Sequence, residues 1–211
     1  MIYLMAVMAL LQSDTAEDTF KRLEESLVQA KSLRIKYRLD FAQGDQTATA
    51  TGTLLLKEGN KAKIVMVGAK GNPWAVSDGT KVTVDARQAA VDGATWVTPK
   101  DLNVRMATKV ARWGILDLPS LPRLIRIYEN EPRERLKVSD FAFGQKNGDL
   151  ETLTYVLRDG NGQADIRLWY HPKSLALKKR SLSVANVNIT VTETYEEFTV
   201  NGQIPDESFT P

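Results

Sequence analysis

The sequence predicts an α+β fold, in which a strongly curved antiparallel half-barrel sheet of about ten strands carries helices on its concave apolar face. Segments of alternating apolar and polar residues are separated by turn sequences such as Gly59-Asn60 and Asp78-Gly79, which are typical of hairpins. Two further segments have apolar residues at helical spacing. Because strands twist, a sheet of this size curls, and its concave side is where helices can bury their apolar stripes.

Residues 1–13 begin with the apolar run MIYLMAVMALL. A helix needs about 20 apolar residues to span a bilayer, whereas a run of this length matches the apolar region of a secretory signal peptide. We therefore expect a periplasmic protein, exported by a signal peptide, whose mature chain begins between Ser13 and Ala16. An apolar first helix packed in the core is the alternative.

The first helix is predicted from Asp14 to Lys31, with Asp14 and Glu17 as a capping pair. At Ser32 the apolar period changes from helical spacing to two, and a strand with one polar face follows. Further strands are predicted at residues 47–57, 61–67, 73–77 and 80–85, and after a long interruption at 137–144, 151–158, 165–170, 175–184 and 187–198.

The interruption contains a second helix, predicted at residues 100–113. Thr98, Pro99 and Asp101 resemble a helix start, with the hydroxyl as N-cap and proline at the first helical position. A shorter helical piece from Leu118 to Tyr128 is broken by two prolines, and we expect it to act as a moving lid beside the helix. With no linker or repeat, residues 14–211 are predicted to form one domain.

Composition excludes several function classes. The net charge of +2 does not favour nucleic-acid binding. Without Cys, and with His171 as the one histidine, thiolate and multi-histidine metal sites are excluded, so we expect no metal and no cofactor. No Gly-x-Ser-x-Gly motif is present, and paired acids such as Glu193 and Glu197 arise by chance in a chain with 26 of them. We therefore expect that the protein is not an enzyme. An unrecognised hydrolase is a less favoured alternative.

A hydrophobic ligand cavity is predicted on the concave face. An ordinary closed core is the alternative interpretation for each of its residues. The predicted lining residues are Ile35, Tyr37, Leu39, Ile64, Met66, Trp74, Val76, Leu102, Met106, Val110 and Trp113.

Two groups of basic residues are candidates for exposed surfaces. Arg105, Lys109 and Arg112 share one face of the second helix, where they would either touch anionic headgroups or form a solvated face, and the solvated face is favoured. The run from Lys178 to Arg180 is interpreted as flanking an exposed strand.

Four segments resemble the LolA/LolB family of outer-membrane lipoprotein carriers, in particular its soluble LolA-like members. They are Ser32-Leu-Arg-Ile after the leading helix, Gly52-Thr-Leu-Leu-Leu-Lys57, the hairpin Val76-Ser-Asp-Gly79, and the tail Ile204-Pro-Asp-Glu-Ser-Phe-Thr-Pro211. The resemblance implies a half-barrel of about eleven strands whose concave apolar face, covered by helices, accepts acyl chains of a lipid or lipoprotein. It therefore implies an exported monomeric carrier or chaperone that makes transient contact with a membrane or membrane protein.

This chain departs from the family pattern in two places. Lys57 is followed by Glu58 and Gly59, where the lipoprotein carriers have an Arg-Pro pair that matters for handing cargo onward. The anchored receptor members carry an amino-terminal Cys, which this chain lacks, so it resembles the soluble carrier. An envelope sensor or interaction module on the same scaffold is the alternative function.

Overall fold

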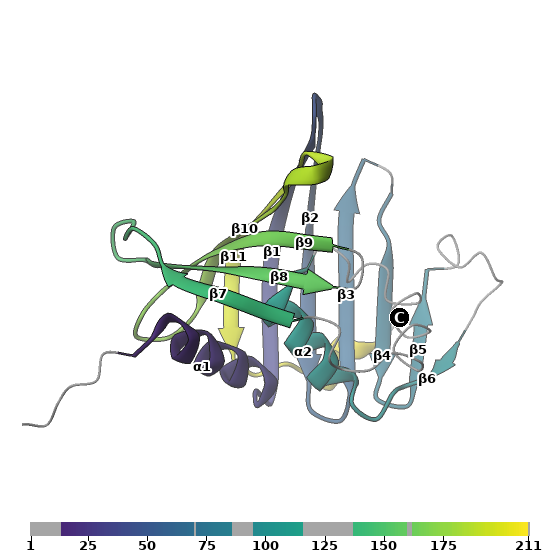
Figure 1. Cartoon of the computed structure of the whole chain (residues 1–211). Helices are drawn as coiled ribbons and strands as arrows, with labels where there is room; N and C mark the ends of the chain where they lie inside the picture. Colours follow the sequence, from purple (N-terminus) through teal and green to yellow (C-terminus); the bar gives the residue numbers. More distant parts are fainter. Residues whose placement is uncertain (1–13, 70, 86–94, 116–136, 160–161, 211) are drawn as a thin grey trace, which may run out of the picture.

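Eleven antiparallel strands form one curved sheet in the computed structural model, which describes residues 14–69, 71–85, 95–115, 137–159 and 162–210 (Figure 1). The helices are α1 (Ala16–Val28) and α2 (Leu102–Arg112), and two 3-10 turns are η2 (Ala185–Val187) and η3 (Asp206–Phe209). The strands are β1 (Ser32–Gln43), β2 (Gln46–Lys57), β3 (Lys61–Gly68), β4 (Trp74–Asp78), β5 (Lys81–Val84), β6 (Trp96–Val97), β7 (Lys137–Phe143), β8 (Glu151–Asp159), β9 (Gly162–Tyr170), β10 (Leu177–Val184) and β11 (Ile189–Val200).

The first and last strands of the chain pair at the middle of the sheet. The order is β6-β5-β4-β3-β2-β1-β11-β10-β9-β8-β7, so two meanders leave the central β1–β11 pair in opposite directions. The end strands β6 and β7 do not pair with each other, and the sheet stays open. The predicted α+β half-barrel is confirmed. In Figure 1 the sheet curls so that β7 to β9 pass across β1 to β3.

Helix α1 forms because one stripe of its residues is apolar and its first turn is capped. Phe20, Leu23 and Leu27 are buried against the sheet. Thr15, not Asp14, is the N-cap, and it forms a capping box in which Asp18 accepts from the Thr15 backbone and hydroxyl. The N-cap is one residue later than predicted. The Thr15 hydroxyl takes this role because it accepts a hydrogen bond from the Asp18 backbone N–H at 3.1 Å.

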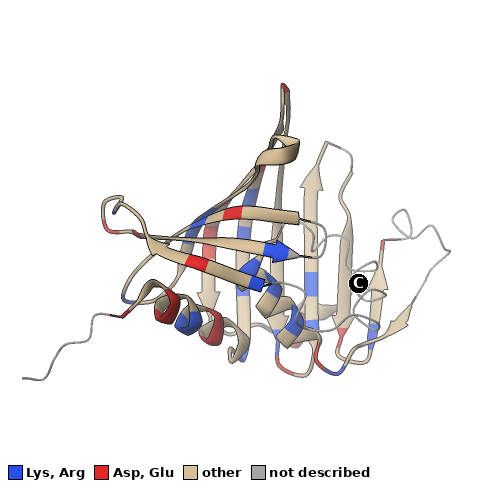
Figure 2. Ribbon diagram, in the orientation of Figure 1, with Lys and Arg blue, Asp and Glu red and all other residues tan. Residues whose placement is uncertain are grey.

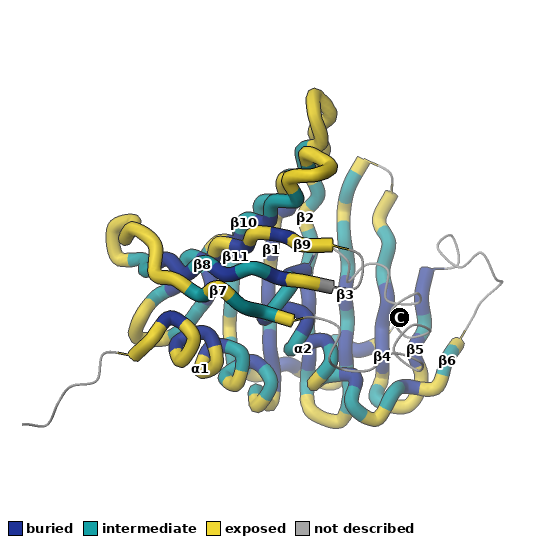
Figure 3. Tube along the Cα trace, in the orientation of Figure 1, coloured by how far each residue is buried: buried dark blue, intermediate teal, exposed yellow. Residues whose placement is uncertain are grey.

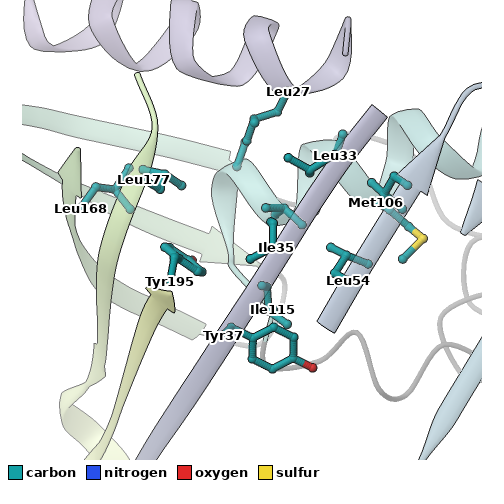
Figure 4. Close-up of a cluster of buried hydrophobic side chains, with 14 of the residues drawn as sticks. Leu27, Leu33, Ile35, Tyr37, Leu54, Met106, Ile115, Leu168, Leu177 and Tyr195 are labelled. Carbon is teal, nitrogen blue, oxygen red and sulfur yellow. The ribbon is translucent and has the colours of Figure 1, made fainter. Parts of the chain in front are cut away.

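The main core lies between the concave face and the two helices. Residues from both meanders contribute to it, as Figure 4 shows for Leu33 and Ile35 of β1 and Leu168 of β9. Figure 3 shows that the buried parts of β1 to β4 lie at the level of the helices, while the far ends of β1 and β2 are exposed. The helices therefore cover part of the concave face.

A smaller apolar cluster lies on the opposite, convex face. Ile204 and Phe209 of the carboxyl-terminal tail are buried against Val76, with Leu55 and Trp74 packed beside them. Three of the segments that carry the family resemblance thus meet in one place: the end of β2, the β4 hairpin and the tail.

The strand predictions are confirmed to within about three residues at each end, and the structure adds β6, whose two residues are too few to show a period. The predicted signal segment at 1–13 and the predicted lid at 118–128 lie outside the described residues. Neither of the described helices α1 and α2 is long and apolar enough to cross a membrane.

Candidate functional site

The concave interior brings together most of the predicted cavity residues. Nine of the eleven belong to the main core or pack against it. Ile35, Tyr37, Leu39, Ile64, Leu102, Met106 and Val110 are at most 4% exposed, whereas Met66 and Trp113 are partly buried at its periphery. Among the described residues these side chains pack as a core that the two helices close.

Trp74 and Val76 do not join that interior, so placing them with Ile64 was wrong. Ala75 pairs with Ile64 and faces the main core, which directs the residues on either side of it to the convex face. Trp74, Ala75 and Val76 are three consecutive apolar residues, so the sequence alone does not fix their phase. The tail residues Ile204 and Phe209 cover the two larger side chains on that convex face.

Large apolar side chains remain partly exposed on the β3–β6 side of the interior. Met66 of β3 and Trp96 of β6 pack against the main core without being fully buried. The inner face between them is lined by small or branched residues, including Ala75 and Val82, which are fully buried. This side of the concave face is apolar across several strands and is bordered by flexible and aromatic side chains.

Gly52, the first residue of one family-like segment, makes room for an aromatic ring. Tyr37 lies opposite it on β1, and its hydroxyl donates to the Val65 carbonyl at 3.3 Å. A Cβ at position 52 would clash with the hydroxyl of Tyr37 and with that carbonyl. Burial raises the pKa of Tyr37 far above its usual value, so the hydroxyl stays protonated as a donor.

Helix α2 begins later than predicted because its expected cap is used elsewhere. The hydroxyl of Thr98 bonds to the Ser77 hydroxyl at 2.8 Å and does not cap the helix. The N-cap is Asp101, whose carboxylate accepts from Arg105 at 2.8 Å. Asn103 donates to the Lys57 carbonyl, which fixes the amino end of α2 to the β2–β3 turn.

The basic face of α2 is neither a headgroup-binding patch nor a solvated face, which corrects both interpretations. Arg112 binds Glu24 of α1 through two contacts of 2.5 and 3.2 Å. Arg105 is paired within the helix, and Lys109 is 7% exposed. In Figure 2 the charged residues of α2 are basic, whereas α1 carries both acidic and basic residues.

The carboxyl end of α2 rests on a buried polar cluster, which we call the α2 anchor: Arg180, Glu193, Tyr155 and Tyr195. Arg180 is completely buried, donates to the Ala111 carbonyl at 2.8 Å and lies 3.7 Å from Glu193. Glu193 accepts from the Ile115 backbone at 2.7 Å and from the Tyr195 hydroxyl.

Tyr155 completes the anchor by donating to the Arg112 carbonyl at 2.6 Å. Burial raises the pKa of Tyr155 to about 12, so this hydroxyl keeps its proton. Gly114 follows the helix at φ +109°, and a Cβ there would clash with both Arg180 and Glu193. The anchor thus satisfies carbonyl groups that every helix leaves unpaired at its carboxyl end.

This anchor was not predicted from the sequence. Interpreting Arg180 as part of an exposed basic run was wrong, because β10 lies inside the sheet between β9 and β11. A signal was present: Arg180 is two residues before Leu182, so the strand period places both on one face. Glu193 and Glu197 lie on opposite faces, since Glu193 is buried in the anchor while Glu197 pairs with Lys36 on the outer face.

The described residues contain no group of three or more acidic or histidine side chains that could hold a metal ion.

Comparisons with known proteins give likenesses of fold at low sequence identity. No family model matches the chain, and no curated protein does. Solved structures that it resembles include a LolA superfamily protein from Nitrosomonas europaea, with 11% identity, TM-score 0.42, and coverage of 94% of this chain and 99% of the other. Another is LprF from Mycobacterium bovis, with 9% identity, TM-score 0.43, and coverage of 90% and 95%.

A third likeness is to the MucA/MucB complex of Pseudomonas aeruginosa, with 9% identity and TM-score 0.47. It covers 93% of this chain but 60% of that chain, so the present chain spans well under two thirds of its length.

Proposed function

We propose that this protein is an exported carrier that binds acyl chains of a lipid or lipoprotein inside its curved sheet. The observation that carries this proposal is the open eleven-stranded sheet, whose concave face is apolar in both meanders and is covered by two short helices among the described elements.

The β3–β6 side is the part of this face that suits a ligand. Met66 and Trp96 keep contact with solvent there, and a chain lying along the inner face would cover them. Methionine adapts its shape to variable partners. Burying about fifteen methylenes at about 0.8 kcal/mol each offers on the order of 12 kcal/mol before the costs of ordering the ligand and protein.

Helix α2 forms a fixed wall of this site in our proposal. Its amino end is bonded to the β2–β3 turn through Asn103, and its carboxyl end is held by Arg180 and Glu193. Lifting α2 would take the Ala111 carbonyl from Arg180 and the Ile115 backbone N–H from Glu193, and leaving a buried polar group without its partner costs about 1–3 kcal/mol, more for a charged group. Cargo would therefore enter beside α2, without lifting it from the sheet.

Acyl binding is better supported than the transfer of lipoproteins to an acceptor. Lys57 is held on the convex face, where it donates to the Ile204 carbonyl at 2.8 Å and to Asp206 at 2.5 Å. Glu58 follows it as an exposed acid in place of the family's arginine. The lysine of this segment therefore holds the tail in place.

A fluorescent acyl probe tests the proposal with two neighbouring residues of β3. Met66 faces the interior, while Val67 is 49% exposed on the other face of the same strand. Met66→Gln should weaken the binding of dansyl-labelled undecanoic acid about tenfold, whereas Val67→Gln should leave it unchanged.

Thermal melts of the two variants show whether folding accounts for the loss, and competition with palmitate shows whether the probe site accepts a natural acyl chain. The proposal fails if the unsubstituted protein binds no probe, or if the two variants behave alike.

A further inference from the structure

The hairpin formed by β9 and β10 concentrates positive charge. Residues 162–184 contain five basic residues and one acid, Asp165. Arg180 is buried beside Glu193 in the α2 anchor, so it adds no charge to the surface. The other four basic residues against one acid leave the hairpin with a net charge of +3, while the whole chain has a net charge of +2. This hairpin therefore accounts for the net positive charge of the chain.

Three side chains of the hairpin form a patch on the outer face of the sheet, which we call the basic patch: Arg167, Trp169 and Lys179. Alternation along β9 buries Leu168 and Tyr170 on the inner face and directs Arg167 and Trp169 outward. Lys179 of β10 lies opposite Trp169. The Lys179 Nζ lies 4.9 Å and the Arg167 Cζ 5.9 Å from the centre of the Trp169 ring, so both cations approach one aromatic ring.

The neighbouring strands place no acid opposite either cation of the basic patch. Arg167 pairs with Thr154 of β8 and with Ser181 of β10. Lys179 pairs with Thr194 of β11 on its other side. Both cations are exposed, and neither forms an ion pair with a residue in the described part of the chain.

Basic residues elsewhere on the outer face do have acidic partners. Lys36 binds Glu197, Arg38 binds Asp40, and Lys61 binds Asp206. Their charges are compensated within the protein, whereas those of the basic patch face solvent without compensation. A cationic surface of this kind attracts an anionic partner.

The Trp169 ring indicates which anionic partner fits best. The ring is half-buried on the outer face, between the two cations. Tryptophan has an apolar body and a polar N–H, and it is enriched where proteins meet the headgroups of a bilayer. Exposed lysine and arginine side chains beside it are attracted to anionic lipids, and Lys173 in the adjoining turn adds a third exposed cation. A nucleic acid would need a longer basic surface than one hairpin provides.

We propose that the basic patch docks this protein on the surface of a bilayer that contains anionic phospholipids. Trp169 lies at the level of the headgroups in this arrangement, and Arg167 and Lys179 lie beside lipid phosphates. The contact is peripheral and uses the outer face of the sheet. It does not depend on acyl binding, because no residue of the basic patch belongs to the concave interior.

Co-sedimentation of the full chain with vesicles tests this docking. The protein should bind vesicles of an equal mixture of phosphatidylcholine and phosphatidylglycerol more tightly than phosphatidylcholine alone, and added salt should weaken the binding. The double variant Arg167→Gln/Lys179→Gln should bind the mixed vesicles at least about tenfold more weakly. Its matched control, Lys81→Gln/Lys100→Gln, removes two exposed charges on the β5–β6 side and should keep the binding of the unsubstituted protein.

Quenching of tryptophan fluorescence by vesicles with brominated acyl chains tests the orientation. The chain has four tryptophans, so the unsubstituted protein should lose part of its fluorescence, and Trp169→Phe should remove this loss. Thermal melts of the double variant should match those of its control, because both pairs of side chains are exposed.

Binding of dansyl-labelled undecanoic acid by the double variant should be unchanged, so a failure of docking and a failure of acyl binding are separate results. Docking is overturned if the mixed vesicles do not bind, or if the double variant binds them as tightly as its control. It is also overturned if a single-stranded oligonucleotide binds through the basic patch while the vesicles do not.

Discussion

Arg180 contributes to the stability of the fold, although its position in a basic run suggests an exposed side chain. It pairs directly with Glu193 across β10 and β11, and its guanidinium holds the last turn of α2. Two of its nitrogen atoms, Nε and Nη1, have no hydrogen-bond partner among the described residues. A buried charge of this kind depends on its partner, because removing one member leaves the other without compensation in an apolar surrounding.

Arg180→Met should therefore lower the free energy of unfolding by about 3–5 kcal/mol, since it removes the ion-pair partner of the buried Glu193 and the donor to the Ala111 carbonyl. Adding Glu193→Gln to that variant should recover part of the loss, because the amide still accepts from the Ile115 backbone and carries no charge. Urea unfolding measures both effects, provided that the variants have the same m-value as the unsubstituted protein. A cost below about 1 kcal/mol for the single variant would show that the anchor does not hold α2.

Single residues also show where sequence-based prediction stops. Alternation located Ile35, Leu39 and Ile64 on the interior face correctly, because each has polar or exposed residues beside it. It failed at Trp74 and Val76, where apolar residues follow one another and the phase depends on which neighbour covers them. Tertiary contacts with the carboxyl-terminal tail decide which of these residues face the convex side, and the tail is distant from them in sequence.

At the scale of elements, each helix was predicted from its apolar stripe, but its ends were not. With Thr98 as N-cap, helix α2 would begin at residue 99, but it begins three residues later. The Thr98 hydroxyl is hydrogen-bonded to the Ser77 hydroxyl and does not cap the helix. The competing partner comes from another hairpin, which the local sequence does not reveal. Strand ends were predicted more accurately, since hairpin turns such as Asp78-Gly79 mark them directly.

The carboxyl-terminal tail is an element held by charge as well as by packing. Asp206 binds Lys57 at 2.5 Å and Lys61 at 2.7 Å, and these hydrogen bonds lower the pKa of its carboxyl to about 2. A lowered carboxyl pKa stabilises the folded state above the ordinary value of about 4 and loses this effect as the pH falls toward about 2.

Acidification from about pH 5 to about pH 2 should thus loosen the tail, seen as a shift of the Phe209 amide resonance in NMR spectra. Asp206→Asn should remove the part of this pH dependence that comes from the carboxylate, whereas Glu207→Gln, the exposed neighbour, should retain it. If both variants titrate like the unsubstituted protein, the lysine contacts do not fasten the tail.

At the scale of the whole molecule, the sequence predicted a curled antiparallel sheet with helices inside it, because hairpins and alternation are local signals. It did not predict that β1 and β11 would pair, which joins the two meanders into one sheet. That pairing links residues from 146 positions apart, as in Gln43 with Ile189, to 167 positions apart, as in Leu33 with Val200, and no local pattern specifies it. The buried anchor depends on the same assembly, since Arg180 and Tyr155 reach α2 from strands that lie far from it in sequence.

The central claim is that the concave interior holds an acyl chain. Native mass spectrometry of the protein purified gently from its own host tests this most directly, because binding that buries about fifteen methylenes survives such purification. We expect a population whose mass exceeds that of the chain by one lipid, with a smaller lipid-bound fraction in Met66→Gln than in Val67→Gln. A single mass equal to the bare chain, with no lipid in an organic extract of the same sample, would contradict it.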